Sequence, residues 1–274
     1  MDQSLRRRLA ESGVDAGAYT DPFETWCRLR AAEGARASLI DLYALAAHPR
    51  GLAAHELSLE ERDLLTARAL PVMFPGFQVV PNSSRAREPI EVLPYDERWG
   101  GRYQAWRRKL QDALGSVARR IEHVGSTAVA GLPAKPVIDI QVSVQDLETE
   151  SGYVPAIEAL GIQLRSREDE RRYFRPFSGL PRDVQVHVCR TGSEWERRHL
   201  LFRDYLRASP AARDAYTHAK RLVADRWRDD RIAYTDAKGA LILDLMDAAE
   251  EWARASGWGV AALTVSDELG SPGY

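Results

Sequence analysis

The chain has 274 residues, with 38 Lys and Arg against 40 Asp and Glu, a net charge of −2 and 45% hydrophobic residues. This composition is typical of one large or two ordinary folded domains, and the near balance of charge argues against nucleic acid as a partner. No apolar run approaches the roughly 18 residues of a bilayer span, so we expect no membrane association and a cytoplasmic location. Cys27 and Cys189 lie far apart in the sequence, and we expect two reduced thiols and no structural zinc.

Residues 1–85 are expected to form a helical extension. Asp21 followed by Pro22 is a helix start signal, which predicts a helix over residues 22–36, and a second helix is expected over residues 37–47. Ser58 and Glu61 have the spacing of a capping box, and the helix that they open is expected to be closed by Pro71 and Pro75-Gly76.

The apolar side chains of this extension predict a further contact. Phe23, Trp26, Leu29, Leu42 and Tyr43 offer more apolar surface than so short a segment buries alone. We therefore expect residues 1–85 to act as a lid or as a dimerisation arm, which would make the protein a homodimer.

The second part of the chain has a different pattern. Residues 80–89, rich in Pro, Ser and Asn, are expected to be a linker, residues 86–260 a second domain and residues 261–274 a tail. Strands followed by helices indicate an α+β fold with a short mixed sheet flanked by helices. The expected elements are strands over 90–93, 120–124, 137–144, 162–165, 173–177 and 184–189, a helix over 98–114, a turn over 125–136, and about three helices over 194–255.

Two of these strands carry polar residues at alternate positions. In the strand over 137–144, Asp139 and Gln141 face away from the isoleucines and valines, and Gln185 and His187 do the same in the strand over 184–189. If the strands are adjacent, these four residues form a polar shelf over an apolar core. The alternative is an ordinary sheet with one solvated face.

A turn that could hold phosphate precedes the first of these strands. Gly125, Ser126 and Thr127 follow the strand over 120–124, where exposed backbone N–H groups and two hydroxyls would suit a phosphate. Asp139 follows after a short interval and would hold a divalent cation, Mg²⁺ or Mn²⁺. This combination predicts attack on the α-phosphate of a nucleotide.

The segment HVGSTAVAGLPAKPVIDIQV, from His123 to Val142, resembles the signature of the GrpB family of the nucleotidyltransferase superfamily. The likeness continues through residues 172–175, 185–188, 198–207 and 234–238, and it covers residues 90 to 255. The resemblance implies a polymerase-β-like fold, with Gly125 and Ser126 as the phosphate turn and Asp139 as the first catalytic carboxylate. A related domain is also fused to some bacterial dephospho-coenzyme A kinases.

The sequence departs from the superfamily pattern at two positions. A two-metal site needs several carboxylates, but Gln141 stands at the second position and His187 at the candidate third position. A glutamine supplies no charge, and histidine prefers softer ions than Mg²⁺. A one-metal site, a histidine-assisted site and a pocket that only binds therefore all stay open.

Other basic residues are candidates for the same cleft. Lys135, Arg172 and Arg175 could neutralise phosphate, although Lys135 could equally be a solvated loop residue and the arginines part of a solvated hairpin. His123 could orient the phosphate turn or fill a structural role. Further cleft candidates on one predicted helix are Arg198, His199 and Arg203, where Asp204 is expected to be an ion-pair partner.

We therefore expect a nucleotidyltransferase-type enzyme that transfers NMP from an NTP, with ATP as the expected donor, to a small-molecule acceptor. A related alternative is an ATP-dependent amide ligase that forms an acyl adenylate. The alternative from another class is a non-catalytic nucleotide-binding or interaction module, which the residues at 141 and 187 favour.

Overall fold

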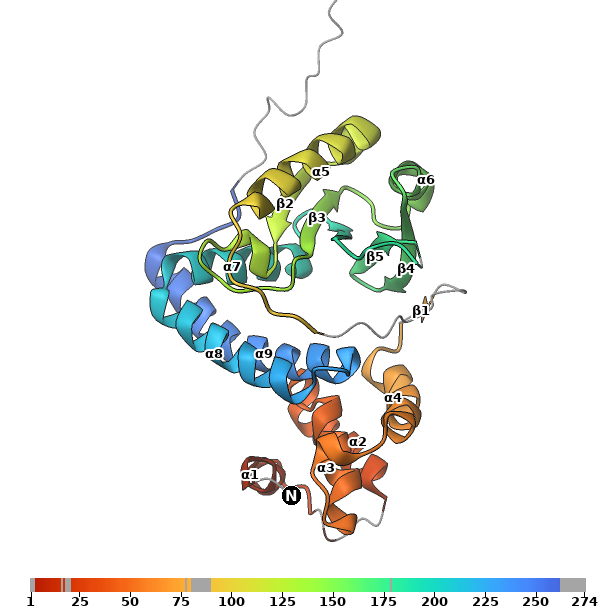
Figure 1. The fold of residues 1–274 in the computed structure, drawn as a ribbon, viewed down its shortest axis with the longest axis vertical. Coiled ribbons are helices and arrows are strands. Elements are labelled where there is room, and N and C mark those ends of the chain that lie inside the picture. Colours follow the sequence, from red (N-terminus) through yellow and green to blue (C-terminus); the bar gives the residue numbers. More distant parts are fainter. Residues whose placement is uncertain are drawn as a thin grey trace, which may run out of the picture. The chain divides into compact units, whose positions relative to one another are not determined.

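The computed structural model describes residues 3–15, 17, 21–76, 78–79, 90–177 and 179–261 (Figure 1). Within these ranges, no helix is both long and apolar enough to cross a bilayer. The chain forms two compact units, of which the first takes residues up to Pro75 together with His218–Asp247. The second takes Glu91–Thr217, the residues from Ala248 onward and a short edge strand. The expected linker over 80–89, the boundary at residue 85 and most of the expected tail fall outside the described residues and stay predictions.

The first unit is helical, as expected. Its N-terminal helices are α1 (Gln3–Glu11), α2 (Pro22–Glu33), α3 (Leu39–Ala47) and α4 (Leu59–Met73), and parts of α8 (Pro210–Arg226) and α9 (Arg231–Ser256) complete it. The Asp21 carboxylate accepts a hydrogen bond from the Phe23 N–H, and the Ser58 hydroxyl accepts one from the Glu61 N–H, so both predicted caps are confirmed. α4 ends at Met73, between Pro71 and the Pro75–Gly76 pair that were expected to close it. Pro71 lies in the last turn of α4, where its missing N–H costs the helix one backbone hydrogen bond near its end.

Four of the five apolar side chains that predicted a further contact are buried inside the first unit, and Phe23 is half-buried. Trp26, Leu29, Leu42 and Tyr43 are each at most 1% exposed. The Tyr43 ring packs 6.3 Å from the ring of Trp227, which belongs to the same unit. Trp227, which directly follows α8 and lies outside residues 1–85, thus helps to cover them, in agreement with the premise that this segment does not bury these side chains alone. The homodimer stays a prediction.

The second unit is α+β and contains one mixed sheet. Its strands are β1 (Gln78–Val79), β2 (Arg120–Val124), β3 (Ile138–Val144), β4 (Ile162–Glu168), β5 (Arg171–Pro176) and β6 (Val184–Arg190), in the order β1-β4-β5-β6-β3-β2. Neighbouring β3 and β6 are parallel, and the other neighbouring pairs are antiparallel. The predicted strands from β2 to β6 are all confirmed, some with an added residue or more at their ends.

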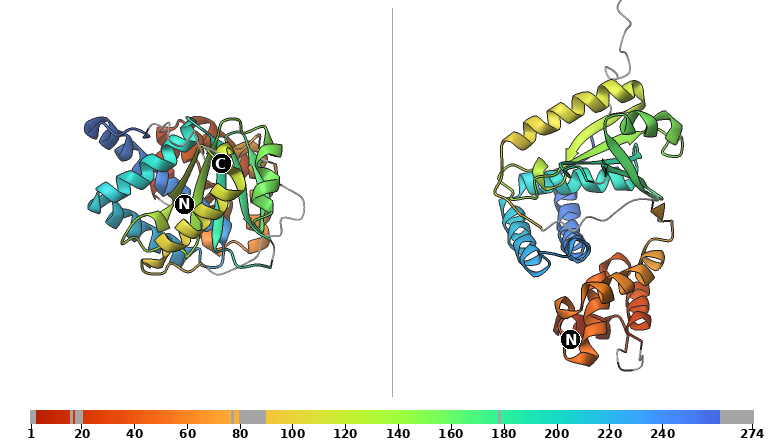
Figure 2. Two further views of the ribbon diagram at one scale, coloured as in Figure 1. Left: turned by 90° about the horizontal axis from the view of Figure 1, so that it is seen from above. Right: turned by 45° about the vertical axis from the view of Figure 1, so that its right-hand side comes forward.

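Helices lie on both faces of this sheet. Figures 1 and 2 show α5 (Arg98–Leu114) on one face and α7 (Glu194–Ala208) on the other. The apolar core lies on the α5 face, where side chains of α5 and the short α6 (Val154–Glu158) pack on the inward residues of the strands. Because Ile138, Ile140 and Val142 fill this core, the alternate residues of β3 must face α7.

The expected strand over 90–93 was wrong. Within it, Leu93 forms an isolated bridge with Ala134, and the Ile90 N–H donates to the carbonyl of Arg228. Pro94 follows directly, and proline has no N–H to extend a ladder. The segment therefore does not form a strand of the sheet.

Candidate functional site

The predicted polar shelf is confirmed on the face of the sheet that faces α7. Parallel pairing places Asp139 opposite Gln185 and Gln141 opposite His187. The His187 Nε2 atom lies 3.7 Å from Asp139 Oδ1, so the two side chains occupy the same face. The Asp139 side chain is 29% exposed, which leaves its carboxylate within reach of a ligand.

The turn after β2 lies directly against this carboxylate. Val124 pairs with Asp139 in the β2–β3 ladder, and Gly125 then adopts a φ of +71°. A Cβ built on Gly125 would lie 2.5 Å from Asp139 Oδ2, which is closer than real Cβ atoms approach. The short 3₁₀ turn Ser126–Ala128 follows, with Ser126 half-buried. Glycine is thus required both by the left-handed backbone and by the contact with Asp139.

His123 holds this turn from the other face of the sheet. The Thr127 hydroxyl donates to the carbonyl of Val137 at 3.1 Å, so it accepts a hydrogen bond from His123 Nε2 at 3.0 Å. The His123 ring stacks on Tyr103 of α5 with 4.7 Å between centroids. Burial lowers the pKa of His123 to about 4, although the Asp139 charge opposes that change. His123 is therefore a neutral anchor that positions the turn and does not itself enter the shelf.

His187 is enclosed by aromatic rings and an arginine. Its ring stacks on Tyr173 at 5.2 Å and lies 5.6 Å from Trp195 of α7. An Arg171 N–H points toward His187 Nδ1 at 3.4 Å. Burial lowers the pKa of His187, the nearby Asp139 carboxylate raises it, and the Arg171 charge lowers it. This arrangement favours a neutral imidazole whose proton is on Nε2, toward Asp139.

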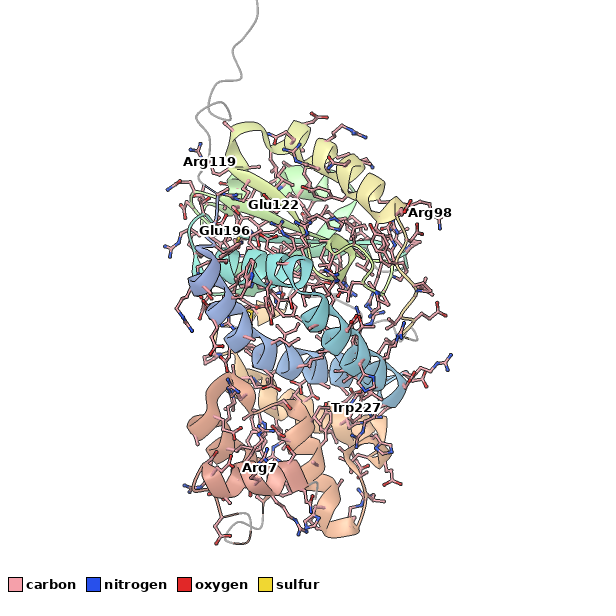
Figure 3. All side chains as sticks on the ribbon, turned by 90° about the vertical axis from the view of Figure 1, so that its left-hand side faces the viewer. Arg7, Arg98, Arg119, Glu122, Glu196 and Trp227 are labelled. Carbon is pink, nitrogen blue, oxygen red and sulfur yellow. The ribbon has the colours of Figure 1, made fainter. Side chains whose placement is uncertain are left out.

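The interior of the shelf is closed to water by α7, so the alternative of an ordinary solvated face is wrong there. Gln141 and Ser143 are both 0% exposed. The Ser143 hydroxyl donates to the buried Glu196 carboxylate at 2.6 Å, whereas neither amide atom of Gln141 has a hydrogen-bond partner among the described residues. Figure 3 shows Glu196 and Glu122 near the layer between the sheet and α7.

Two arginines of α7 connect this helix to β2 and to the turn. Arg203 donates to the Glu122 carboxylate at 2.7 Å and to the His123 carbonyl at 3.1 Å. Arg207 donates to the carbonyl of Ala128 at 2.8 Å. Arg203 and Arg207 also bind Asp204, as expected of an ion-pair partner. Arg203, which was expected in the cleft, therefore holds α7 against β2.

The remaining candidates of α7 lie beside the aromatic wall. The His199 ring stacks on Trp195, with centroids 3.6 Å apart, and its Nδ1 lies 2.8 Å from the Trp195 carbonyl. Arg198 is half-buried, as is Lys135 in the loop before β3. The His199 ring is exposed, and burial of its nitrogen against Trp195 lowers its pKa to about 3.

Arg172 and Arg175, predicted to serve one phosphate site, lie on opposite faces of β5. Arg172 pairs with Val188, which faces the apolar core, and its guanidinium binds Glu148 at 2.8 Å and Glu150 at 2.6 Å. The placement of Arg172 in the cleft was therefore wrong. Arg175 is two residues after Tyr173 in β5 and therefore lies on the same face as Tyr173 and His187. Its side chain is 8% exposed.

Sequence reasoning did not single out Tyr173, Trp195 or Arg171 as members of the site. The period-two pattern of β5 contained the signal, because Phe174 must face the core and its neighbours must then face the shelf. The position of Trp195 depends on how α7 crosses the sheet, which no local pattern shows.

The residues present fit one divalent cation that is shared with a ligand. The described residues contain no group of three His, Cys, Asp or Glu side chains arranged to hold a metal ion. Asp139 is a single partly exposed carboxylate, and Mg²⁺ commonly takes one or two carboxylates and completes its shell with phosphate oxygens and water. A two-metal centre does not fit this donor set.

A separate groove of about 470 Å³ lies behind the turn. It is lined on the α5 side by Tyr95, Tyr103 and His123, and further by Thr127, Arg207 and Arg213. His123 and Thr127 line this groove, whereas Asp139 does not.

Comparison with known proteins agrees with this architecture. The family profile described as GrpB protein matches residues 89–248, and the chain belongs to the GrpB family. A UPF0157 protein of Halalkalibacterium halodurans is 40% identical over 158 residues, which are 57% of this chain and 80% of the relative. A UPF0157 protein of Streptomyces coelicolor is 42% identical over 154 residues, covering 56% and 81%.

Two further similarities bear on fold and ligand. The crystal structure of conserved protein GrpB from Enterococcus faecalis matches with a TM-score of 0.53 and 29% identity, covering 59% of this chain and 99% of that chain. A protein of Mycobacterium tuberculosis named dephospho-CoA kinase is 34% identical over 200 residues, which cover 63% of this chain and 49% of that protein.

Proposed function

We propose that this GrpB-family chain is a nucleotidyltransferase-type enzyme that transfers NMP from an NTP, with ATP as the expected donor, to a small-molecule acceptor. The observation that carries the proposal is the contact between Gly125 and Asp139, in which a Cβ would lie 2.5 Å from the carboxylate. A phosphate on this turn would sit beside the carboxylate without an intervening side chain. Nucleotidyl transfer needs a turn that binds the phosphates and, beside it, an oxygen atom that binds the divalent cation.

Each residue near the turn has a distinct task in this proposal. The backbone N–H groups of Ser126 and Thr127 and the hydroxyl of Ser126 would bind the phosphates, and Lys135 would add positive charge. His123 and Arg207 keep the turn in place through the hydrogen bonds to Thr127 and to the Ala128 carbonyl. Preorganised donors of this kind need no rearrangement during the reaction.

The reaction would be one displacement at the α-phosphorus. A bond forms between the acceptor's hydroxyl or amine atom and the phosphorus, the bond to the β-phosphate oxygen breaks, and pyrophosphate leaves. The acceptor's proton would pass to water, since the Asp139 carboxylate would hold the cation and both ring nitrogens of His187 already face Asp139 and Arg171.

Asp139 would hold the divalent cation, Mg²⁺ or Mn²⁺. The amide oxygen of Gln141, on the same face of the sheet, would be an uncharged ligand for this ion. When bound, such an ion supplies positive charge that stabilises the negative charge developing on the phosphates. The 34%-identical relative named dephospho-CoA kinase supports a nucleotide as the ligand class, and the activity in that name belongs to that protein.

A non-catalytic nucleotide-binding module is the second candidate, and one observation favours it. Gln141 stands where a second carboxylate would be needed, and it is 0% exposed beneath α7. A module of this kind would bind nucleotide on the Gly125 turn and release no pyrophosphate.

Pyrophosphate release separates the two candidates. The protein would be incubated with each NTP, Mg²⁺ or Mn²⁺ and a pool of extracted metabolites. We expect release that Asp139→Asn abolishes and that Asp112→Asn, at an exposed carboxylate of α5, leaves unchanged. Nucleotide binding without release under any condition would support the module and contradict the enzyme.

A further inference from the structure

The groove behind the Gly125 turn has the size of a small-molecule site. Its volume is about 470 Å³, and all of its lining residues belong to the second unit. One wall is formed by Tyr95 and the first turns of α5, and a second by residues 127–130. The third wall is formed by Arg207 of α7 and Arg213 of α8. Sites for small ligands commonly enclose about 300–1,000 Å³, so this groove is large enough to hold a small organic molecule.

The charge that lines this groove is positive. Arg207 and Arg213 are among its lining residues, whereas no described Asp or Glu side chain lines it. Arg213 donates to the carbonyls of Leu206 at 3.1 Å and Arg207 at 2.9 Å. The Asp204 carboxylate, which lies 3.3 Å from Arg207, also binds Arg203 at 2.7 Å, so one carboxylate serves two guanidinium groups. The groove therefore favours an anionic ligand.

His123 offers a hydrogen-bond acceptor to the same groove. Its Nε2 donates to Thr127, and burial lowers its pKa to about 4, so the ring is neutral at pH 7. A neutral imidazole whose proton is on Nε2 has a lone pair on Nδ1. His123 is only 7% exposed, yet this Nδ1 accepts no hydrogen bond from any described residue. Buried acceptors normally have a partner, and a hydroxyl group of a ligand in the groove would supply one.

A glycine of α5 leaves room for such a ligand. Gly100 and Gly101 both lie inside this helix, where glycine is destabilising relative to alanine. A Cβ on either residue would meet no atom within 4 Å, so packing does not require glycine at these positions. Gly100 lines the groove and Gly101 does not. A side chain at position 100 would therefore take space from the groove.

We infer that this groove binds a small organic anion that carries a hydroxyl group. The carboxylate or phosphate of this anion would bind the guanidinium groups of Arg207 and Arg213. Its hydroxyl group would donate to Nδ1 of His123. Its carbon skeleton would pack against the Tyr95 ring, which is held edge-on by Trp99 with 5.5 Å between the ring centroids.

This ligand is distinct from the nucleotide of the proposed function. Neither Gly125 nor Asp139 lines the groove. The groove and the turn share His123 and Arg207, whose hydrogen bonds to Thr127 and to the Ala128 carbonyl hold the turn from behind. Because binding in the groove requires no nucleotide, the inference can be tested by itself.

Titration of the histidine resonances tests this site. The full-length protein has six histidines, and it would be labelled with ¹⁵N-histidine and studied by NMR at pH 7, with ionic strength held constant by sodium chloride. The probes are two pairs that differ in hydroxyl groups, malate with succinate and glycerol 3-phosphate with propyl phosphate. We expect the hydroxylated member of at least one pair to shift the Nδ1 resonance of His123, which is identified by its loss in His123→Gln. This member should bind about fivefold more tightly than its partner, the effect of one hydrogen bond.

Two glycine variants control for the position of the ligand. Gly100→Leu fills part of the groove and should abolish binding, whereas Gly101→Leu, at the next residue of α5, should leave affinity unchanged. Both variants should raise the melting temperature, because leucine favours a helix more than glycine does. A loss of binding that is confined to Gly100→Leu would therefore not be caused by unfolding.

Two arginine variants control for the charge. Arg213→Gln should weaken binding about tenfold, the effect of one charge-assisted hydrogen bond. Arg190→Gln removes an exposed arginine at the end of β6, outside the groove, and should leave affinity unchanged.

The inference is overturned if no probe shifts the His123 resonance of the wild-type chain, or if neither hydroxylated probe binds more tightly than its partner. It is also overturned if Gly100→Leu binds the probe as the wild type does, since the ligand would then lie outside the groove. Because no nucleotide is present, probe binding that Gly100→Leu abolishes would stand even if pyrophosphate release were never observed. Pyrophosphate release without probe binding would support the proposed function alone.

Discussion

The carboxylate of Asp139 lies against the main chain of Gly125, and no side chain separates them. A Cβ at Gly125 would lie 2.5 Å from Oδ2 and 3.0 Å from the Asp139 Cβ. The β2–β3 ladder fixes this approach, because Val124 is paired with Asp139. The turn and the carboxylate therefore form one rigid unit, in which a change at one residue displaces the other.

Gly125→Ala should destabilise the fold and abolish nucleotide binding. An alanine at φ +71° is strained by about 1–3 kcal/mol, and its methyl group would also push the Asp139 carboxylate away. Gly131→Ala is the matched control, since Gly131 has φ +79° and a Cβ there would meet no atom within 4 Å. Both variants should lose thermal stability, but only Gly125→Ala should lose nucleotide affinity. Equal nucleotide affinity in the two variants would contradict the role of the turn.

His123 should make stability depend on pH in a defined range. Burial lowers the pKa of folded His123 to about 4, against about 6.5 in an unfolded chain, so the unfolded state binds more protons between these values. Stability is therefore fully present above pH 6.5 and falls as the pH drops toward 4, by about 3 kcal/mol in total. Denaturant unfolding at pH 7 and pH 5 measures this loss.

The control for this pH dependence is His123→Gln, which cannot titrate in this range. This variant should be less stable than the wild type at pH 7, because Gln cannot reproduce the stacking on Tyr103. Its further loss between pH 7 and pH 5 should be smaller by about 2 kcal/mol. If the free energy of unfolding fell equally with pH in both proteins, His123 would not be the group that causes the pH dependence.

Local patterns were sufficient to predict the strands that carry the site. Alternation in β3 and β6 placed Asp139 and His187 on one face, and the structure pairs these strands. An amphipathic stripe ending at Gly115 predicted α5 with the observed bounds. These features depend on residues near one another in sequence, which is why the sequence alone could indicate them.

The remainder of the site depends on contacts between distant segments. Arg172 and Arg175 looked equivalent in the sequence, but an odd separation along β5 places them on opposite faces. A bulge at Arg165 interrupts the pairing of β4 with β5, and no period-two pattern predicts a bulge. Gln141 is closed off by α7, whose crossing over the sheet is set by Glu196 and Arg203.

Divalent cations should bind weakly to the protein alone and more tightly with ATP. Asp139 is one carboxylate, and its charge is insufficient to dehydrate Mg²⁺ or Mn²⁺ without phosphate oxygens. Calorimetric titration of each metal, first alone and then with ATP present, measures the difference. Asp112→Asn should behave as the wild type does, because this carboxylate is on the exposed side of α5. Tight metal binding to the nucleotide-free protein would contradict the prediction.

Deletion of residues 1–85 should give a chain that aggregates or unfolds at lower temperature. Within the first unit, Arg62 binds Asp230 at 2.7 Å, and the Ile40 N–H donates to Asp236 at 3.0 Å. The deletion leaves these carboxylates and the Trp227 ring without their partners and exposes apolar surface of α8 and α9. Light scattering after gel filtration and thermal unfolding would test this. A truncated chain that is monodisperse and equally stable would show that residues 1–85 are an independent module.

Asp139→Asn should abolish turnover and metal-dependent nucleotide binding while thermal stability stays unchanged or rises. The partner of Asp139 within the shelf is His187, at 3.7 Å, and burial lowers the pKa of that imidazole. Arg172 binds Glu148 and Glu150 on the other face of the sheet. Removing the charge of Asp139 therefore breaks none of the arginine ion pairs described above and relieves the cost of holding a partly buried carboxylate.

A structural Asp139 predicts the opposite result. If the carboxylate served mainly to pair with a cation such as Lys135, the substitution would leave that cation unpaired and cost about 3–5 kcal/mol. Melting temperature and nucleotide affinity measured on Asp139→Asn, with Asp112→Asn beside it, separate the two cases. Lower stability with nucleotide binding intact would remove Asp139 from the site and, with it, the main support for an enzyme.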